Sequence, residues 1–274
     1  MSWAEIGDFN GDTKLDILIT SSNASGVFVF PGNGDGTFQG PVTTDVSRET
    51  ALWPEVNDFD QDGILDHAFA HANSGRMTIH LGNGDATFQA GVEYATGAIP
   101  QSPISSDFNN DGIPDLAVSS NTSGIAIFLG NGDGTFQVAP KVDVVSPLYC
   151  AAGDFNGDSN VDIVVSSVGT VLCLGNSDGT FQSGLTIHSG SGPLAVADVN
   201  GDGAFDGALS ADFFTFTLLL GDGDATFTLP TTYGTGYLFV GFSILADLDG
   251  DDLPEAIVNN VAGAQSVLRN STKL

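Results

Sequence analysis

Short blocks of apolar residues alternate along this chain with polar blocks, and the order of the blocks repeats. Near the start, apolar residues dominate positions 3–7, 17–20 and 27–30, and Asp, Asn, Ser and Gly dominate the segments between them. Blocks of this length, rich in Ile, Val and Phe, are typical of β-strands, and no segment has the helical spacing of apolar residues. The pattern predicts an all-β protein.

A glycine-rich turn follows the third strand of each repeat except the last. Residues 32–38 read Gly-Asn-Gly-Asp-Gly-Thr-Phe, and close variants follow later in the chain. Gly and Asn readily adopt the positive φ angles of a tight hairpin. After each hairpin, segments such as 39–46 and 89–94 have room for a fourth strand. We expect the closing phenylalanines to anchor the hairpins in the core: Phe38, Phe88, Phe136, Phe181 and Phe227.

Six such repeats of four antiparallel strands predict a six-bladed β-propeller. We expect one domain over residues 1–274, with approximate blades 1–47, 48–97, 98–145, 146–190, 191–236 and 237–274. The last repeat lacks the Gly-Asp-Gly hairpin and a fourth strand. We therefore expect its blade to be incomplete, so that the ring closes imperfectly or a flanking piece completes it.

Each loop between the first and second strands carries carboxylates at regular places. In residues 58–66, Asp occupies the first, third, fifth and ninth places, and the seventh is free to offer a backbone carbonyl. An all-oxygen cage with several carboxylates suits Ca²⁺ better than a transition metal. The alternative for a single loop is an Asp-rich turn that satisfies its own backbone. The frame recurs six times, beginning at Asp8, Asp58, Asp107, Asp154, Asp198 and Asp247.

Together, the Asp-Phe-Asn-Gly-Asp-Gly-x-x-Asp loops and Leu-Gly-Asn-Gly-Asp-Gly-Thr-Phe turns resemble the FG-GAP/VCBS repeat family. Its members include the calcium-binding propeller of integrin α-subunits and many bacterial surface and secreted proteins. The resemblance covers essentially the whole chain and implies up to six Ca²⁺ ions. The implied ligands are Asp8, Asn10, Asp12 and Asp16; Asp58, Asp60, Asp62 and Asp66; Asp107, Asn109, Asp111 and Asp115; Asp154, Asn156, Asp158 and Asp162; Asp198, Asn200, Asp202 and Asp206; and Asp247, Asp249, Asp251 and Glu255.

Three loops depart from this pattern. The sixth place is Gly in three loops but Thr13, Ser159 or Asp252 in the others. If that place needs a positive φ angle, the β-branched Thr13 is costly and the first loop is weaker. Glu is about one methylene longer than Asp, so Glu255 can serve as the ligand at the ninth place only if the sixth loop is correspondingly wider.

The charge balance of the chain fits this interpretation. There are 34 acidic residues against 6 Lys and Arg, a formal net charge of −28, and twenty of the acidic residues stand at the ligand places. Without metal these loops would repel one another, so we expect folding and calcium binding to be linked. Nucleic acid is excluded as a partner, since phosphate binding needs a basic surface. Cys150 and Cys173 are expected to be buried thiols rather than a disulfide.

The sequence also bears on where the protein acts, inside the cell, outside it or in a membrane. Its longest apolar run, residues 237–246, is too short to span a bilayer, so we expect no membrane insertion. No signal peptide stands at the start of the chain as given. The weak affinity expected of these short loops nevertheless fits extracellular calcium, and we expect a monomer that acts outside the cell or at its surface.

A candidate ligand face follows from the aromatic residues that stand five places before the first metal ligand. These are Trp3, Trp53, Tyr149 and Phe242, and Glu5 and Glu55 follow two places after the tryptophans. Aromatic rings beside carboxylates commonly hold sugars by stacking and hydrogen bonding. The alternative is that the rings wedge neighbouring blades together.

The second repeat is unusual in carrying three histidines. His67 and His71 share a strand face, and a turn near residues 73–74 would place His67 opposite His80. The pair could bind a transition metal or respond to pH, but a packed core histidine is the favoured interpretation, because apolar residues occupy the place of His67 in other repeats.

From the sequence we expect a calcium-stabilised module that binds an extracellular glycan or protein, and is not an enzyme. No nucleophile elbow, phosphate loop or zinc motif is present. The alternatives are a polysaccharide-active domain and a purely structural spacer of a larger surface protein.

Overall fold

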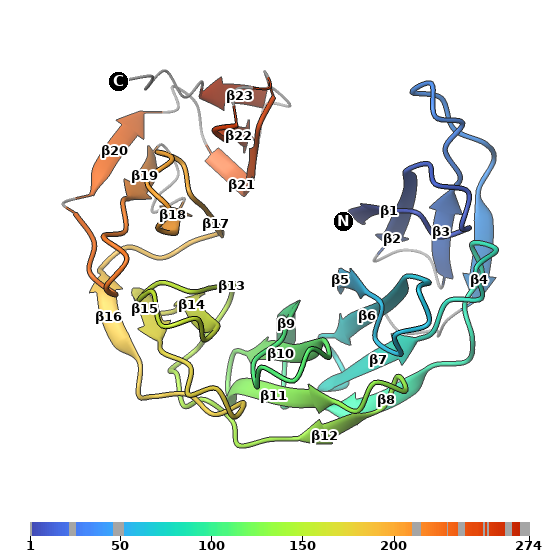
Figure 1. The fold of residues 1–274 in the computed structure, drawn as a ribbon, viewed down its shortest axis with the longest axis horizontal. Helices are drawn as coiled ribbons and strands as arrows, with labels where there is room; N and C mark the ends of the chain where they lie inside the picture. Colours follow the sequence, from blue (N-terminus) through green and yellow to red (C-terminus); the bar gives the residue numbers. More distant parts are fainter. Residues whose placement is uncertain are drawn as a thin grey trace. The chain divides into compact units, whose positions relative to one another are not determined.

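The computed structural model describes residues 2–21, 26–45, 52–209, 215–228, 230–234, 239–248, 250, 252–260 and 265–268. The chain divides into two compact units. Figure 1 labels their strands, from β1 near the N-terminus to β23 near the C-terminus. The first unit contains Met1–Ser146 with Asp178–Thr180, and the second contains Pro147–Ser177 with Phe181–Leu274. The expectation that residues 1–274 form one domain stays a prediction.

The first unit contains three four-stranded sheets, and every neighbouring pair of strands is antiparallel. The first sheet is β1 (Ser2–Gly7), β2 (Asp16–Ser21), β3 (Gly26–Phe30) and β4 (Val42–Asp45). The second is β5 (Leu52–Asn57), β6 (Asp66–His71), β7 (Arg76–His80) and β8 (Val92–Ala95). The third is β9 (Pro100–Ser106), β10 (Asp115–Ser120), β11 (Gly124–Gly130) and β12 (Phe136–Val138).

The second unit contains two further four-stranded sheets and, among its described residues, one sheet of three strands. The first is β13 (Cys150–Gly153), β14 (Asp162–Ser166), β15 (Thr170–Cys173) and β16 (Leu185–His188). The next is β17 (Leu194–Ala197), β18 (Asp206–Leu209), β19 (Thr215–Leu219) and β20 (Thr231–Gly234). The last is β21 (Phe239–Ala246), β22 (Glu255–Asn260) and β23 (Gln265–Leu268).

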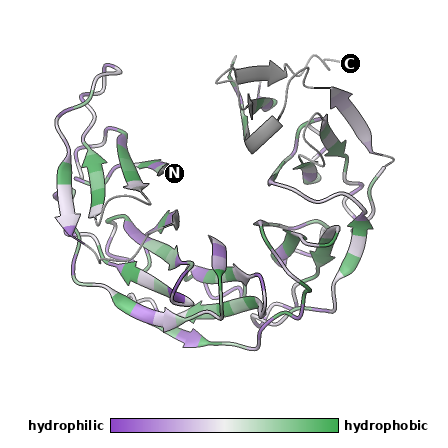
Figure 2. Ribbon diagram, turned by 180° about the vertical axis from the view of Figure 1, so that it is seen from behind, coloured by the Kyte–Doolittle hydropathy of each residue, from purple (hydrophilic) through white to green (hydrophobic). Residues whose placement is uncertain are grey.

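The middle strands form the core, because both of their faces are covered by neighbouring sheets. Every residue of β6 and β10 is buried, whereas the outer strand β8 is largely exposed. Figure 2 shows hydrophobic residues concentrated on the strands and hydrophilic ones on many of the connecting loops. A strand that is buried on both faces has a continuous run of apolar residues. The sequence therefore shows apolar blocks rather than a strict alternation of apolar and polar residues.

Within the first unit, the sheets pack face to face through aromatic and aliphatic side chains. Leu18 and Val29 of the first sheet join Phe69 and Phe88 of the second in one cluster. Residues from the opposite face of the second sheet, such as Met77, join Leu116 and other residues of the third sheet in another cluster. Each sheet is therefore a blade that depends on its neighbours for its core.

The predicted fold class is confirmed: the protein is all-β, built from four-stranded antiparallel propeller blades, and its last blade has three strands among the residues that the structure describes. Where the structure describes the chain, it contains no helix of the length and apolar character needed to cross a membrane.

One detail of the predicted core is wrong. Phe88 and Phe136 are buried, but Phe38 is 45% exposed. Phe88 packs edge-on against Phe9 of the preceding repeat, and Phe136 packs in the same way against Phe59. Phe38 belongs to the first repeat, so residues 1–146 contain no preceding repeat to cover it.

Candidate metal centre

The six carboxylate loops join the first and second strands of each sheet and turn through the left-handed region twice. The fourth and sixth places of the second loop, Gln61 and Gly63, have φ angles of 59° and 87°. Thr13, Ser159 and Asp252 at the sixth place have φ angles of 66°, 68° and 70°. The sixth place does need a positive φ angle, and Thr13 adopts one although β-branched residues rarely do.

The carboxylates that would bind metal also hold the loop backbone in shape. In the second loop, Asp58 Oδ1 accepts a hydrogen bond from Asp62 N (3.0 Å) and Oδ2 accepts one from Gly63 N (2.8 Å). Asp62 Oδ1 in turn accepts one from Ile64 N (2.8 Å). Equivalent bonds to the sixth place recur in the other loops, at Asp8, Asp107, Asp154, Asp198 and Asp247. The loops are therefore preformed, and each carboxylate keeps lone pairs for a cation.

The carboxylate at the ninth place ties its loop to the hairpin of the same repeat. Asp66 is buried, its Oδ2 accepts from Phe59 N (2.8 Å), and its Oδ1 accepts from Gly82 N (2.7 Å). The same pair of bonds occurs at Asp16, Asp115, Asp162 and Asp206. These bonds explain why a Gly opens every hairpin, since a Cβ at Gly82 would lie 2.5 Å from the carbonyl oxygen of Leu65.

Burial makes the charged form of the ninth-place carboxylate costly when no cation is near. Burial, with the charges of Asp60 and Asp58 adding to it, raises the pKa of Asp66 to about 7. Burial likewise raises the pKa values of Asp115, Asp162 and Asp206 to about 6. A cation beside these groups would favour their charged forms.

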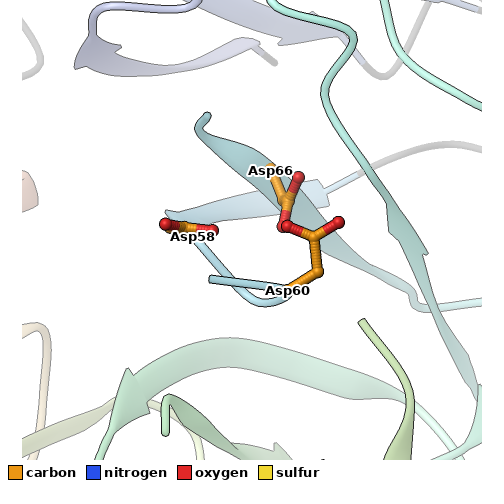
Figure 3. Close-up of side chains that lie close together, drawn as sticks. All are labelled: Asp58, Asp60 and Asp66. Atoms are coloured by element: carbon orange, nitrogen blue, oxygen red, sulfur yellow. The ribbon is translucent and has the colours of Figure 1, made fainter. Parts of the chain in front are cut away.

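In the second loop three carboxylates converge. Oxygen atoms of Asp58, Asp60 and Asp66 all lie within 4.8 Å of one another, and Figure 3 shows Asp60 and Asp66 pointing toward each other with Asp58 beside them. A set made only of oxygen atoms, with a buried carboxylate among them, fits a hard divalent cation such as Ca²⁺.

The first and last loops depart from this arrangement. In the first loop, Lys14 Nζ lies 3.0 Å from Asp12 Oδ2, and its hydrogen bond lowers the Asp12 pKa. An internal cation therefore already neutralises one of the predicted ligands. In the sixth loop, Glu255 Oε2 accepts from Leu248 N (2.8 Å), as Asp does elsewhere. Its buried Oε1 has no partner among the described residues, and Asp249 and Asp251 lie outside them.

The aspartates of the hairpins cap their own turns. Asp85 Oδ1 accepts from both the backbone N (3.0 Å) and the hydroxyl of Thr87, and these bonds lower the Asp85 pKa. Asn83 Nδ2 donates to the same hydroxyl (2.9 Å). The first and third hairpins have the same bonds, so these three turns are held by an Asn-Asp-Thr side-chain network, whereas Asp222 stands in the place of Asn in the fifth.

A contact that the sequence analysis missed joins the hairpins of the second to fifth repeats to the metal loop of the preceding repeat. Ala86 N donates to the carbonyl of Phe9 (2.9 Å), the second residue of the first loop. We call this contact the hairpin latch. It recurs from Gly134 to Phe59 (3.3 Å), from Gly179 to Phe108 (3.2 Å) and from Ala225 to Phe155 (2.9 Å). The available signal was the Gly or Ala at the same place of every hairpin. Gly adopts the positive φ angle of this place freely, whereas Ala86, at 66°, adopts it at a cost.

The candidate ligand face is partly assembled in the first unit. The rings of Trp3 and Trp53 lie 5.4 Å apart at 54°, and both side chains are partly exposed. Trp53 stands at a β-bulge with a φ angle of 48°, a strained conformation for a bulky residue. Tyr149 belongs to the second unit, and the side chain of Phe242 lies outside the described residues.

Glu5 on β1 and Glu55 on β5 are both partly buried, and the charge of Glu55 acts on Glu5. Burial, and then the charge of Glu55, raises the pKa of Glu5 to about 7, and burial raises that of Glu55 to about 7. Glu55 Oε1 accepts from the backbone N (2.9 Å) and the hydroxyl (2.6 Å) of Ser105, and Asn57 Nδ2 donates to the same hydroxyl (3.0 Å). Ser105 and Asn57 position Glu55, and no motif in the sequence indicated them.

The histidines of the second repeat are core residues. His67 pairs with His80 across β6 and β7 as predicted, and both are buried with rings stacked 4.9 Å apart. Burial, and then the charge of His80, holds the pKa of His67 well below its usual value. Neither ring nitrogen of His67 has a hydrogen-bond partner among the described residues. Cys150 and Cys173 are buried thiols, as expected.

Comparison with known sequences supports the repeat assignment. The family described as FG-GAP-like repeat matches residues 8–69, 58–118 and 107–165. Each match begins at the first carboxylate of a metal loop and runs into the strand that follows the next loop. Among curated proteins, none matches the sequence.

Solved structures of the same fold include two lectins. A lectin of Agrocybe aegerita that recognises non-reducing terminal N-acetylglucosamine matches with a TM-score of 0.70 at 21% identity, over 98% of this chain and 80% of that one. The BP39L lectin of Burkholderia pseudomallei matches with a TM-score of 0.75 at 14% identity, over 97% and 79%. BBS1N, solved in complex with ARL6DN, matches at 0.71 and 13% identity, over 97% and 78%. At these identities the likeness shows the fold alone.

Proposed function

Because the chain belongs to the FG-GAP-like repeat family, we propose that it is a calcium-stabilised β-propeller module that binds an extracellular ligand. The observation that carries the proposal is the convergence of Asp58, Asp60 and Asp66 on preformed loop backbone. We place the module outside the cell or at its surface, as a monomer, where millimolar calcium can fill weak sites.

Calcium would be held by the carboxylate and amide oxygens of the loops, with the seventh-place carbonyl completing each set. The ion supplies positive charge where buried carboxylates such as Asp66 otherwise resist ionisation. Asp58 and Asp62 hold the loop amides, so the cage needs little rearrangement to receive the ion. The loops then stiffen the edge of each blade, and the ligand binds elsewhere.

For the ligand, we favour a glycan, recognised at Trp3 and Trp53 with Glu5 and Glu55 beside them. Partly exposed aromatic rings stack on the C–H faces of sugars, and carboxylates held in place, such as Glu55, accept bonds from hydroxyl groups. The two lectins of the same fold support this choice over a surface protein.

A glycan panel probed in millimolar calcium, and again after chelation, tests the proposal. We expect calcium-dependent binding that Trp53→Ala abolishes. Tyr233→Ala is the matched control, because Tyr233 is a partly exposed aromatic residue of the second unit and its loss should leave binding intact. Silence across the panel, with calcium demonstrably bound, would refute the lectin proposal and favour a protein-binding or spacer module.

A second candidate function, polysaccharide cleavage, is favoured by one observation. Glu5 and Glu55 both have pKa values raised to about 7, which suits a general acid and base at neutral pH. Incubating any glycan that binds with the protein and analysing it for shortened products tests this. Cleavage that Glu55→Gln removes while binding persists would establish the enzyme, whereas intact glycan would leave a binding module.

A further inference from the structure

In the first unit, the hairpins of the second and third repeats each contact two different metal loops. In the second repeat, Gly82 at the start of the hairpin donates to Asp66, the ninth-place ligand of its own loop (2.7 Å). Four residues later, Ala86 donates to the carbonyl of Phe9 in the loop of the preceding repeat (2.9 Å). The third repeat does the same, with Gly130 donating to Asp115 (2.8 Å) and Gly134 to Phe59 (3.3 Å).

The hairpin between these two contacts is a compact body. Asn83 N donates to the carbonyl of Thr87 (3.0 Å), Gly82 pairs with Phe88, and the Asn-Asp-Thr network ties the side chains together. A displacement at Gly82 is therefore carried to Ala86 rather than absorbed within the turn. The position of Asp66 is thus mechanically linked to the position of Phe9.

Phe9 stands between the first and third ligand places of its own loop. Fixing the position of its carbonyl therefore restricts the positions of these two ligands. Its backbone N also donates to Asp16, the ninth-place ligand of that loop (3.0 Å). Both polar groups of this one residue are consequently fixed, one by its own repeat and one by the next.

We propose that the hairpin latches couple the calcium loops, so that filling one loop strengthens binding at the loop of the adjoining repeat. The proposal rests on the proposed calcium function. An ion that draws in Asp66 fixes the hairpin of the second repeat, and the fixed hairpin holds the first loop in its binding shape. By linkage the effect is reciprocal between the two loops. Because each latch is one backbone hydrogen bond, we expect a change of about two- to tenfold in dissociation constant per neighbour.

The test follows each loop separately during a calcium titration. The sixth-place amides of Thr13, Gly63 and Gly112 each donate to the first ligand of their own loop, so their NMR shifts report the first, second and third loops. The third loop is disabled with Asp107→Asn and Asp111→Asn. We expect the second loop to weaken about two- to tenfold and the first loop, which shares no hairpin with the third and feels its loss only through the second, to weaken less.

A charge-neutral variant separates the latch from the general electrostatic field. Thr135→Val removes the hydroxyl that accepts from Asn131 (2.9 Å) and donates to Asp133, which loosens only the hairpin of the third repeat. In this background, disabling the third loop should no longer affect the second. Thr87→Val, the same change in the hairpin of the second repeat, is the matched control and should preserve the effect.

The outcomes are distinct. Amides that do not respond to millimolar calcium in the unaltered protein would refute the calcium function itself. If calcium binds but the dissociation constant of the second loop does not change when the third loop is disabled, the coupling is refuted and the calcium function is not. Weakening of the first and second loops to the same degree, or weakening that survives Thr135→Val, would show that the latch does not link the sites. The link would then be charge, global stability or the direct bond from Gln61 Nε2 to the carbonyl of Gly112 (3.0 Å).

Discussion

Replacing His67 with leucine should stabilise the first unit, and increasingly so as the pH falls. His67 is fully buried, and neither of its ring nitrogens is hydrogen-bonded to a described residue. Leu116 stands at the matching place of the third repeat and is also fully buried, so the fold accepts leucine there.

The magnitude follows from the contacts. A buried polar group without a partner costs about 1–3 kcal/mol, and His67 has two. Against this, the ring contacts with Phe69, His80 and Phe88 are lost, at about 0.5–1.5 kcal/mol each for aromatic pairs. Leucine regains part of this by its own packing, and we expect a net gain of about 1 kcal/mol at pH 8.

The pH dependence has a definite sign. The unfolded chain protonates this histidine near pH 6.5, whereas burial keeps the folded form neutral to a much lower pH. Its contribution to stability is therefore full above pH 6.5 and falls as the pH drops below it. The advantage of the leucine variant should grow by about 1.4 kcal/mol per pH unit, or about 2 kcal/mol at pH 5.

Urea unfolding in saturating calcium, followed by tryptophan fluorescence, measures this directly. Both tryptophans, Trp3 and Trp53, lie in the unit that contains His67. Subtracting the wild-type free energy of unfolding at each pH removes the titration of the metal-loop carboxylates, which both proteins share. His80→Leu is the comparison variant: it breaks the bond to the carbonyl of Gln89 and should gain less. A His67→Leu variant less stable than wild type at pH 5 would refute the reasoning.

Three further predictions concern the metal and the acidic pair. Thorough chelation should lower the melting temperature steeply, because each ion at a hundred times its dissociation constant adds about 2.7 kcal/mol to the free energy of unfolding. An unchanged melting temperature would refute stabilisation by calcium. Asp58→Ala with Asp62→Ala should loosen the second repeat without abolishing the fold, as circular dichroism would show; complete unfolding in saturating calcium would contradict blade-by-blade stability. Glu5→Gln should stabilise the protein by about 1 kcal/mol at pH 8, because burial raises the pKa of Glu5 to about 7. The stability that Glu5 provides is full below pH 4.5 and falls as the pH rises to 7. An equal stability of both proteins at pH 8 and pH 5 would refute this.

The sequence predicted those features that depend on local chemistry repeated in register. The second strand was expected at residues 17–20, and β2 is Asp16–Ser21. The pairing of His67 with His80 followed from the length of one turn. The preformed loops were also foreseeable, since Asp, Asn and Gly at fixed places can satisfy a turn and a cation with the same oxygens.

Other features depend on which repeat lies beside which, and a single repeat does not contain that information. The exposure of Phe38 results from the absence of a preceding sheet within its unit, although its motif matches that of the buried Phe88. Ser105 is polar and stands in a strand without any motif, yet it fixes Glu55 of the neighbouring repeat. The second role of Asp66, a predicted ligand that also accepts a hydrogen bond from Gly82, was hidden because a motif shows the spacing of ligands and not the partners of each carboxylate oxygen.

The hairpin latch also bears on how such chains grow and shrink by duplication. The sequence repeat begins and ends between blades, but a metal loop is supported by a hairpin encoded in the next repeat, as Phe9 is by Ala86. Recombination at the boundary between two sequence repeats therefore separates a loop from the hairpin that supports it. The repeat that becomes the new neighbour must provide an equivalent hairpin. The uniform small residue at this hairpin place makes the repeats interchangeable, and the smallest heritable piece that carries a complete site is two adjoining repeats.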